Sequence, residues 1–458
     1  MTAARDRRIT QSLGQFIEAL RYEDIPAAGV ERAKASLLDA VGCCLAGSVT
    51  EEAEPVRRMA AADGGTPIAQ VLGQSLRLPP AAAALVNATA GHAMDYDDSS
   101  PPMIGHPSVN LMSVLFALGE RQGSTGADIV TAYVAGLEVG ARLGRHLNPS
   151  HYAAGWHATA TLGTLAAAAA AARLLGFDSD RARNTMGIAA SSASGIRKNF
   201  GSMVKPLHAG FAARNGVIAA LLAAEGHTAD PDVLDGERGF IDVFGGAETP
   251  DLTGLHFGLD QPLEIMASGV GIKRYACCGC THSALDALLA LREEYRFDAA
   301  SIASMTCTMN GLVPDILVHH RPASPAQAKF SMEYCLAVAA IDGDCGMDQF
   351  SEARVEESRV RSLLERVTTS VDPAIEYRNG VYPGLVTVNF RDGSSISRYA
   401  DEAKGHPDLP LALSELRLKF MSCARRGISE DRAAAAFESL AALEQQANIR
   451  VLAKRLAG

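Results

Sequence analysis

The sequence predicts a mainly α-helical protein, with a large all-helical domain and a smaller α+β domain. Alanine runs separated by glycines fill the first 270 residues, where no stretch alternates with period two. Alanine has the highest helix propensity, and glycine ends helices. Only 5% of the residues are aromatic, so small aliphatic side chains build the core and let helices pack closely. Strand-like alternation is confined to residues 271–400.

Residues 9–270 are expected to be mostly helical, with alanine runs at 81–84, 166–172 and 219–224. Gly226 follows Leu-Leu-Ala-Ala-Glu, where a glycine typically ends a helix. The most apolar stretch, residues 162–175, contains Arg173 and is too short to cross a bilayer. We therefore expect no membrane partner.

The smaller domain is predicted over residues 271–399. Residues 305–309 alternate, and so do residues 386–390, which precede the turn Asp392-Gly393. This pattern predicts strands and a hairpin. Helices are expected over residues 283–295, 326–341 and 355–367. The helical stretch 411–456 is expected to pack back on the first domain, which would then comprise residues 1–270 and 400–458.

Composition excludes several classes of protein. Lys plus Arg is 42 and Asp plus Glu is 52, a formal charge of −10, so binding of nucleic acid through bulk positive charge is excluded. With 48% hydrophobic and 21% charged residues, the chain is packed rather than disordered. Nine scattered cysteines give no disulfide framework, and residues 1–10 begin no apolar leader. We expect a cytoplasmic location.

The first candidate segment, residues 91–108, holds three carboxylates in four positions, Asp95, Asp97 and Asp98. They repel one another unless a cation or a hydrogen-bond donor is close. One interpretation is a solvated acidic turn. Another is a loop that places His106 at a cleft, with Asp95 orienting or charging a neighbouring base. The Asp-x-Asp-Asp acid of a terpene cyclase would need an aromatic-lined cavity, which the composition disfavours.

Two further segments carry a histidine and a lysine. His157 is expected to begin a helix, where the positive end of the dipole favours a neutral imidazole and hence a base. Lys205 precedes Pro206 and is expected to be extended, immediately before a helix. Its neighbours Met203, Val204 and Leu207 would partly desolvate it. The alternatives are a core histidine and a surface lysine.

The fourth segment, residues 273–282, reads Lys-Arg-Tyr-Ala-Cys-Cys-Gly-Cys-Thr-His. Cys277 and Cys280 form a Cys-x-x-Cys, but structural zinc needs a second ligand pair, and the other cysteines have unsuitable spacing. We therefore expect no metal. The favoured interpretation is a loop that brings Lys273 and His282 to the domain boundary, with the cysteines as small buried side chains. A fifth segment, residues 324–334, is predicted to be a capped structural helix.

Together these segments supply a cationic set, namely His106, His157, Lys205, Lys273 and His282. Phosphate-binding and dinucleotide-binding glycine motifs are absent from the sequence. Imidazole and ammonium groups indicate an anionic substrate and proton transfer. A helical oligomeric scaffold that binds a ligand without chemistry remains the alternative.

In order and spacing, these segments resemble the MmgE/PrpD family, which includes 2-methylcitrate dehydratase, cis-aconitate decarboxylase and iminodisuccinate epimerase. The resemblance covers residues 38–47, the loop from His92 to Ser108, and residues 155–159, 205–210, 273–282 and 328–331. The chain departs from the family pattern at Ala276, where many members have proline.

The resemblance implies a large all-helical domain and a smaller α+β lid domain, with the active site between them, in a homodimer without cofactor or metal. The residues implied around the substrate are Asp95, Ser99, His106, His157, Lys205, Lys273 and His282, with Tyr275 and His208 as further substrate-binding candidates.

The substrate is expected to be a small polycarboxylate. The hypothesis is that His157 transfers the proton next to a carboxylate, while Lys205 and Lys273 stabilise the enediolate. His106 would be an acid for a leaving hydroxyl or a second base. A citrate-like hydro-lyase is favoured, followed by an epimerase of an imino- or amino-dicarboxylate such as iminodisuccinate, and then by a cis-aconitate-type decarboxylase.

Overall fold

The computed structural model describes residues 8–246, 250–378 and 380–458 of the chain. These residues form two compact units. Unit 1 contains the described parts of 1–93, 97–270 and 413–458, and unit 2 contains those of 94–96 and 271–412. Most of the N-terminal segment used to predict the location, residues 1–7, lies outside the described residues.

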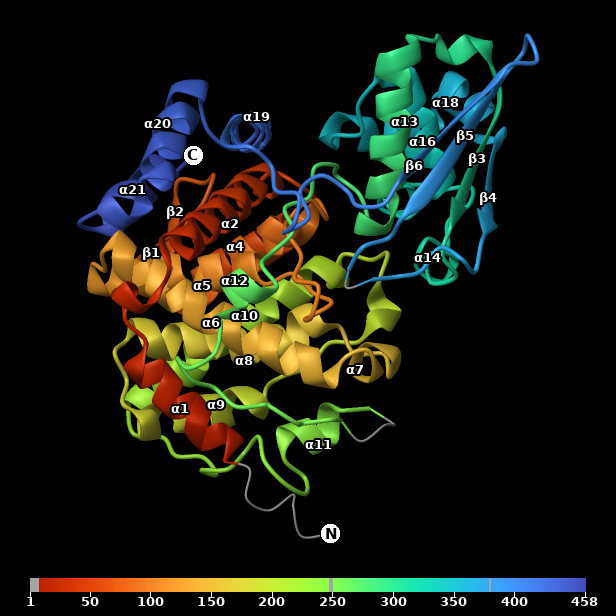
Figure 1. Ribbon diagram of the computed structural model, residues 1–458. Helices are drawn as coiled ribbons and strands as arrows, with labels where there is room; N and C mark the ends of the chain where they lie inside the picture. Colours follow the sequence, from red (N-terminus) through yellow and green to blue (C-terminus); the bar gives the residue numbers. More distant parts are fainter. Residues whose placement is uncertain (1–7, 247–249, 379) are drawn as a thin grey trace. The chain divides into compact units, whose positions relative to one another are not determined.

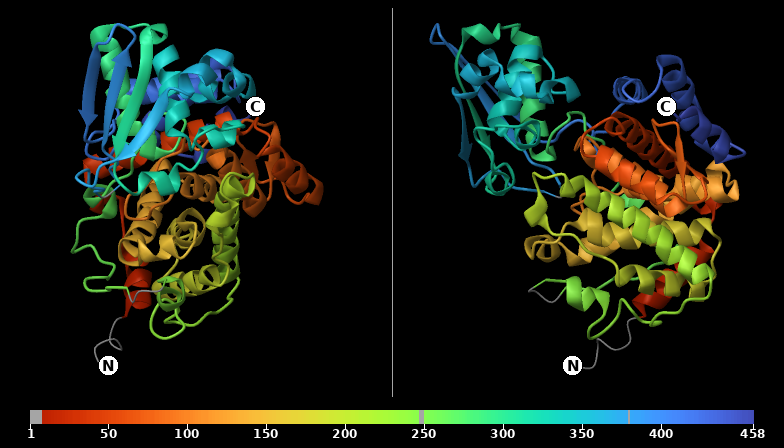
Figure 2. Two further views of the ribbon diagram at one scale, coloured as in Figure 1. Left: turned by 90° about the vertical axis from the view of Figure 1, so that its right-hand side faces the viewer. Right: turned by 180° about the vertical axis from the view of Figure 1, so that it is seen from behind.

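Unit 1 is built almost wholly of helices (Figures 1 and 2). Its α-helices are α1 (Ile9–Ala19), α2 (Ala27–Gly47), α3 (Glu54–Asp63), α4 (Pro80–Ala93), α5 (Ser108–Gln122), α6 (Gly126–Leu147), α7 (Ser150–Ala153), α8 (Ala158–Leu174), α9 (Ser179–Ala190), α10 (Val204–Ala224), α11 (Phe240–Phe244), α12 (Glu264–Ala267), α19 (Leu413–Ala424), α20 (Glu430–Ala441) and α21 (Ile449–Arg455). Three 3₁₀ turns accompany them, η1 (Tyr22–Asp24), η2 (Arg197–Asn199) and η6 (Leu443–Gln445).

Helix α8 is the central helix of unit 1, buried along its length except at Arg173. The alanine run lets α6 and α10 approach its backbone. A Cβ on Gly136 of α6 would lie 2.8 Å from the Ala166 carbonyl oxygen, and one on Gly216 of α10 would lie 2.6 Å from the Ala167 Cβ. Small side chains on both partners therefore produce the tight packing that the composition predicted.

Helix α10 ends as the sequence predicted. Gly226 adopts a φ of 89°, and the N–H groups of Gly226 and His227 donate to the carbonyls of Ala223 and Leu222, a Schellman ending. Among the described residues α10 is also the one helix long and apolar enough to cross a bilayer. It packs extensively on α4 and α8, which is how the core helix of a globular domain behaves.

Some of the non-helical structure in unit 1 was not predicted from the sequence. Strands β1 (Ala69–Val71) and β2 (Leu76–Leu78) form an antiparallel hairpin. The described residues between Gly226 and Ala267 contain only the short helices α11 and α12. Three-residue strands carry too little alternation to be recognised from sequence.

Unit 2 contains one four-stranded sheet in the order β4-β3-β5-β6, in which β3 and β4 are parallel and the other pairs are antiparallel. Helices α13 and α16 pack on the sheet (Figure 1). The elements are η3 (Gly279–Thr281), α13 (His282–Tyr295), η4 (Ala299–Ser301), β3 (Ile302–Met309), α14 (Val313–Ile316), α15 (Pro325–Ala328), α16 (Met332–Asp342), η5 (Met347–Phe350), α17 (Glu352–Glu356), α18 (Ser358–Leu364), β4 (Val367–Val371), β5 (Gly384–Phe390) and β6 (Ser395–Ala400).

The predicted strands and hairpin are confirmed. Met305, Cys307, Val386 and Val388 face the core, while the alternate residues are more exposed. The turn Asp392-Gly393 joins β5 to β6.

Three helix predictions in unit 2 were wrong. Neither the stretch 324–334 nor the stretch 326–341 is one helix, because α15 ends at Ala328 and Ser331 caps a new helix, α16. Ser324 does cap α15, accepting from the Gln327 N–H. The stretch 355–367 divides into α17 and α18, and Val367 already begins β4. Side-chain caps from serine offer the backbone an ending that periodicity does not reveal.

Candidate active site

Four histidines from separate elements of unit 1 lie in a row. His92 comes from the end of α4, His106 from the loop before α5, His157 from the N-cap of α8 and His208 from α10. The ring centroids are 4.6 Å apart for His106 and His92, 5.8 Å for His92 and His157, and 5.2 Å for His157 and His208. We call these four residues the histidine cluster.

Asp97 connects the first two rings. His92 Nδ1 lies 2.9 Å from Asp97 Oδ2, and His106 Nδ1 lies 3.5 Å from the same oxygen. His106 Nδ1 also lies 2.6 Å from the Asp98 carbonyl oxygen, which can only accept. The Nδ1 hydrogen of His106 is therefore donated to the backbone, and in the neutral ring the lone pair is on Nε2.

The other two rings bond each other directly. His157 Nδ1 lies 3.0 Å from His208 Nδ1, so one nitrogen donates and the other accepts. Two imidazolium rings would place two N–H groups face to face, so at most one of the pair is protonated at a time. The pair can therefore hold or release a single shared proton.

Burial favours the neutral form of this pair. It lowers the pKa of His157 well below 6.5, and the charges of His92 and Lys205 lower it further. Burial, with the same two charges, lowers the pKa of His208 to about 4. The prediction of a neutral imidazole at His157 agrees with this, although desolvation is the main cause rather than the helix dipole.

Lys205 lies beside the histidine cluster, and 7% of its surface is exposed. Its Nζ is 5.7 Å from the centre of the Phe200 ring, which packs edge-on against His157. The prediction of an extended Lys205 was wrong, because α10 begins at Val204 and Pro206 is its third residue. The first N–H groups of a helix lack partners, so a proline there removes no hydrogen bond.

The N-terminus of α8 holds the His106 loop in place. The His106 N–H donates to Thr159 Oγ1 at 3.1 Å, and Asn110 Nδ2 donates to the Thr159 carbonyl at 2.8 Å. A Cβ on Gly105 would lie 2.9 Å from the Thr159 nitrogen, so only glycine allows this approach.

The three carboxylates of residues 95–98 are all buried, so the solvated-turn interpretation was wrong. Asp97 serves the histidines. Asp98 accepts from the Ser108 N–H at 3.3 Å, and burial followed by the charge of Asp39 raises its pKa well above 3.8. Asp95, with a φ of 51°, belongs to unit 2.

In unit 2, Asp95 binds Lys273. Lys273 Nζ lies 2.7 Å from the Asp95 carbonyl oxygen and 3.2 Å from Asp95 Oδ2, and both side chains are buried. The Tyr96 hydroxyl donates to the Arg274 carbonyl at 2.9 Å. These bonds fix the charge of Lys273 at one place in the unit.

The remaining predicted residues have separate surroundings. The Tyr275 hydroxyl donates to Asp286 Oδ1 at 2.6 Å, and the Tyr275 ring packs edge-on against His282. His282 begins α13, with Nε2 3.2 Å from the Cys277 carbonyl oxygen. Ser99 is half-buried beside the bridge between Ser100 and Gly105.

The structure thus brings His106, His157, His208 and Lys205 together in unit 1. It brings Asp95, Lys273, Tyr275 and His282 into unit 2. Sequence reasoning assigned no site role to His92 and Asp97. The one clue to them in the sequence is that His92 follows an apolar stretch and lies five positions before Asp97, the middle of the three carboxylates.

A buried cluster of imidazoles with a lysine has the chemistry that proton transfer requires, and here it lies on a helical scaffold. The model of the MmgE/PrpD N-terminal domain matches residues 11–253, and that of the MmgE/PrpD C-terminal domain matches residues 275–445. The chain belongs to the MmgE/PrpD family.

Its relatives include several decarboxylases. A cis-aconitate decarboxylase-like protein, oryM, of Aspergillus oryzae is 29% identical over 98% of this chain and 97% of its own length. Cis-aconitate decarboxylase of Homo sapiens is 29% identical over 99% and 95%. That of Aspergillus terreus is 29% identical over 93% and 91%. Family and relatives together make the chain an enzyme of the lyase type.

Proposed function

We propose that the enzyme transfers a proton at a carbon next to a carboxylate of a small di- or tricarboxylate, without a cofactor. The observation that carries this proposal is the buried His157–His208 pair, 3.0 Å apart, in the same cluster as Lys205. A carbon acid beside an ionised carboxylate is very weak, so removing its proton needs a neutral base and a nearby positive charge. The cluster supplies both.

His157 is the base in this proposal, because burial keeps it neutral and its partner His208 can share the proton. Lys205 stabilises the enediolate that forms when the carbon loses its proton. His106 is the acid, because the Asp97 carboxylate 3.5 Å from its Nδ1 favours the protonated ring.

Unit 2 contributes binding in the same proposal. Lys273 carries a buried charge with a fixed position, which suits a charge-assisted hydrogen bond to a substrate carboxylate. His282 and Tyr275 lie within the same segment and complete the proposed binding set, together with Asp95 and Ser99.

Decarboxylation of a cis-aconitate-like acid is the reaction we favour, because the relatives carry that activity in their names. The bond between carbon and one carboxylate breaks and CO2 leaves. The electron pair enters the carbon skeleton, where a neighbouring carboxylate held by lysine stabilises it. The shared proton of the His157–His208 pair then protonates the carbon, so His157 donates a proton in this reaction, and one proton is consumed for each CO2 released.

Dehydration of a citrate-like acid, which the sequence favoured, is the second candidate. It needs a base for the α-proton and an acid for the leaving hydroxyl, and the cluster offers both in His157 and His106. Without a leaving group, return of the proton on the other side of the carbon would give epimerisation, the third possibility.

A substrate panel in D2O tests the proposal. Pure protein is incubated with cis-aconitate, 2-methylcitrate and amino-dicarboxylates, and proton NMR follows products and deuterium entry while a sensor follows CO2. We expect CO2 and a deuterated alkene from cis-aconitate. Alkene formation from 2-methylcitrate without CO2 would replace decarboxylation by dehydration.

The His157→Gln variant should lose these signals, while His227→Gln, which changes an exposed histidine of the same unit, should keep them. Absence of turnover and exchange with every acid would leave the scaffold interpretation. The homodimer and the cytoplasmic location stay predictions, which light scattering and fractionation of the source cells test.

A further inference from the structure

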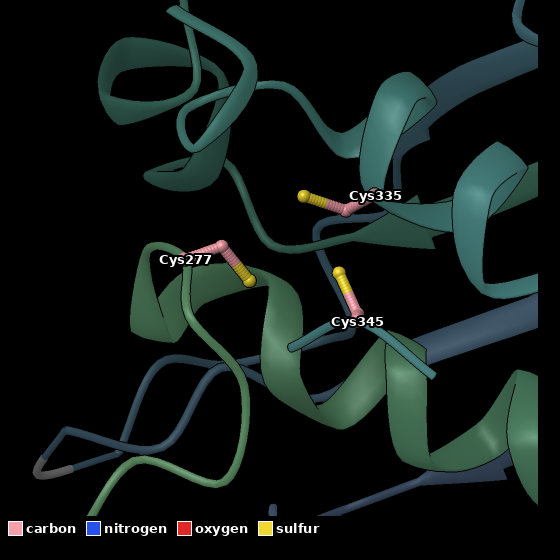
Figure 3. Close-up of side chains that lie close together, drawn as sticks. All are labelled: Cys277, Cys335 and Cys345. Carbon is pink, nitrogen blue, oxygen red and sulfur yellow. The ribbon is translucent and has the colours of Figure 1, made fainter. Parts of the chain in front are cut away.

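Three cysteines of unit 2 that lie far apart in the sequence come together in the structure. Cys277, Cys335 and Cys345 are fully buried, and their Sγ atoms all lie within 4.8 Å of one another. Figure 3 shows the three sulfurs turned toward a common centre. Along the sequence Cys335 and Cys345 are isolated, and their spacing matches no zinc motif.

The backbone holds the three segments in register. Cys335 lies in the first half of α16, and its N–H donates to the Ser331 carbonyl at 3.1 Å. The Cys345 carbonyl accepts from the Ala276 N–H at 3.1 Å, directly before Cys277. The arrangement of the sulfurs therefore follows from secondary structure and from hydrogen bonds that do not involve the thiols.

We propose that Cys277, Cys335 and Cys345 bind a soft d10 cation through three sulfurs. Thiolates select Cu(I) and Zn(II) over the hard cations. A Zn–S bond of about 2.3 Å places tetrahedral sulfurs about 3.8 Å apart, so the observed group needs to contract by no more than about 1 Å. Among the described residues, these three sulfurs form a group in which every ligand atom lies within 4.8 Å of the others.

The two ions make different demands on the site. Cu(I) is satisfied by the three sulfurs alone, whereas Zn(II) takes a fourth ligand. Thr281 Oγ1 lies 3.0 Å from Cys277 Sγ and donates its hydrogen to the Cys278 carbonyl at 2.8 Å, so it accepts from the Cys277 thiol, whose hydrogen metal binding would displace. Loading must release the thiol protons, so affinity should rise with pH.

Such an ion would connect the segment that carries Lys273 and His282 to helix α16. Cys277 lies four residues after Lys273 and five before His282. The role inferred is structural, and it stands independently of the proposed proton transfer.

The experiment uses the full-length protein, reduced and handled without oxygen. Protein is mixed with one equivalent of Cu(I) or of Zn(II), dialysed against a weak chelator, and analysed for bound metal and by X-ray absorption. We expect about one ion per chain with three sulfur neighbours. In the Cu(I) arm the spectrum should show three sulfur neighbours alone. In the Zn(II) arm it should show three sulfurs and one lighter atom.

Matched variants locate the site. Cys335→Ala should retain at least tenfold less metal, whereas Cys307→Ala, another fully buried cysteine of unit 2, should bind like the unmodified protein. Cys278→Ala/Cys280→Ala should also bind normally. Metal that survives Cys335→Ala, or that is lost in the double variant, would overturn the assignment.

If Cys335→Ala fails to fold, the metal content and the X-ray absorption spectrum of the unmodified protein still test the proposal. No retained ion in either arm, or an absorption spectrum with fewer than three sulfurs, overturns the proposal. Because these readouts report binding alone, they are separate from any failure of the lyase assay.

Discussion

The two units hold their basic side chains in different ways. In unit 1, burial keeps His157 and His208 neutral, and the two rings bond each other. In unit 2, Lys273 is held by both the carbonyl and the carboxylate of Asp95. The first arrangement allows a proton to move, whereas the second fixes a positive charge.

This difference suits the two units to distinct tasks. A catalytic acid or base must change its protonation state, so it needs a site where both states are within reach. A binding group works best with a constant charge in a constant place. We therefore expect changes in unit 1 to lower kcat, and changes in unit 2 to raise KM or to destabilise the unit.

The largest effect is expected for Lys205→Met. Methionine keeps the bulk of the side chain beside Phe200 but removes the charge that we propose stabilises the enediolate. Removing one such group costs about 100- to 1000-fold in kcat. Steady-state kinetics on the substrate found by the panel measures this loss.

Lys198→Met is the matched control, since it removes an exposed lysine seven residues away. Its kinetics should be unchanged, and far-ultraviolet dichroism should show both variants folded. Wild-type kcat in Lys205→Met would place the chemistry outside unit 1.

Lys273→Met tests the fixed charge of unit 2. The change leaves the buried Asp95 carboxylate without its ammonium partner, which costs about 3 kcal/mol of unfolding free energy. Urea unfolding followed by dichroism measures the loss. Lys273→Met/Asp95→Asn removes both charges and should recover much of the stability.

The double variant also separates binding from stability. It should stay poorly active, with a raised KM, because the proposed partner of the substrate carboxylate is gone. Full recovery of activity together with stability would mean that the pair is structural only.

The sequence predicted the fold where one physical signal dominates. Alanine runs predicted the core helices, and alternation predicted β3 and the β5–β6 hairpin. It failed at Ser331, where a side-chain cap ends one helix and begins the next. It failed at β1 and β2, whose three-residue strands depend on pairing with each other.

For the site, the sequence predicted which side chains are chemically useful, but not their partners. Nothing in Asp95-Tyr-Asp97-Asp98 shows that one carboxylate binds a lysine of unit 2, one binds a histidine and one has its pKa raised by burial. His92 ends an apolar helix and has the sequence context of a core residue. Partner choice depends on tertiary contacts that periodicity does not encode.

The pH dependence of stability tests whether burial keeps unit 1 neutral. The pKa of His208 is about 4 in the folded chain, against an ordinary value near 6.5, so the unfolded chain binds the extra proton as pH falls. Stability is therefore complete above about pH 6.5 and is lost toward pH 4. Between about pH 7 and about pH 5 this residue should cost about 2 kcal/mol.

His208→Gln, which cannot titrate, should show a flatter dependence over that range in urea unfolding. His227→Gln should behave like the unmodified protein, because His227 is exposed. Equal slopes for all three proteins would show that His208 is charged in the folded state as well.

The smallest effect is expected at the carboxylate that orients the histidines. Asp97→Asn keeps the shape but removes the charge beside His92 and His106, so His106 becomes a weaker proton carrier. We expect about a tenfold loss of kcat/KM, with an altered pH profile. Asp98→Asn is the internal control: burial raises the pKa of Asp98 and so disfavours its charge, and the amide should change kcat/KM less than about twofold. Stopped-time assays of both variants across pH measure the two effects. A larger loss in Asp98→Asn than in Asp97→Asn would show that the charge of this loop lies on Asp98, and unit 1 would then hold a fixed charge as unit 2 does.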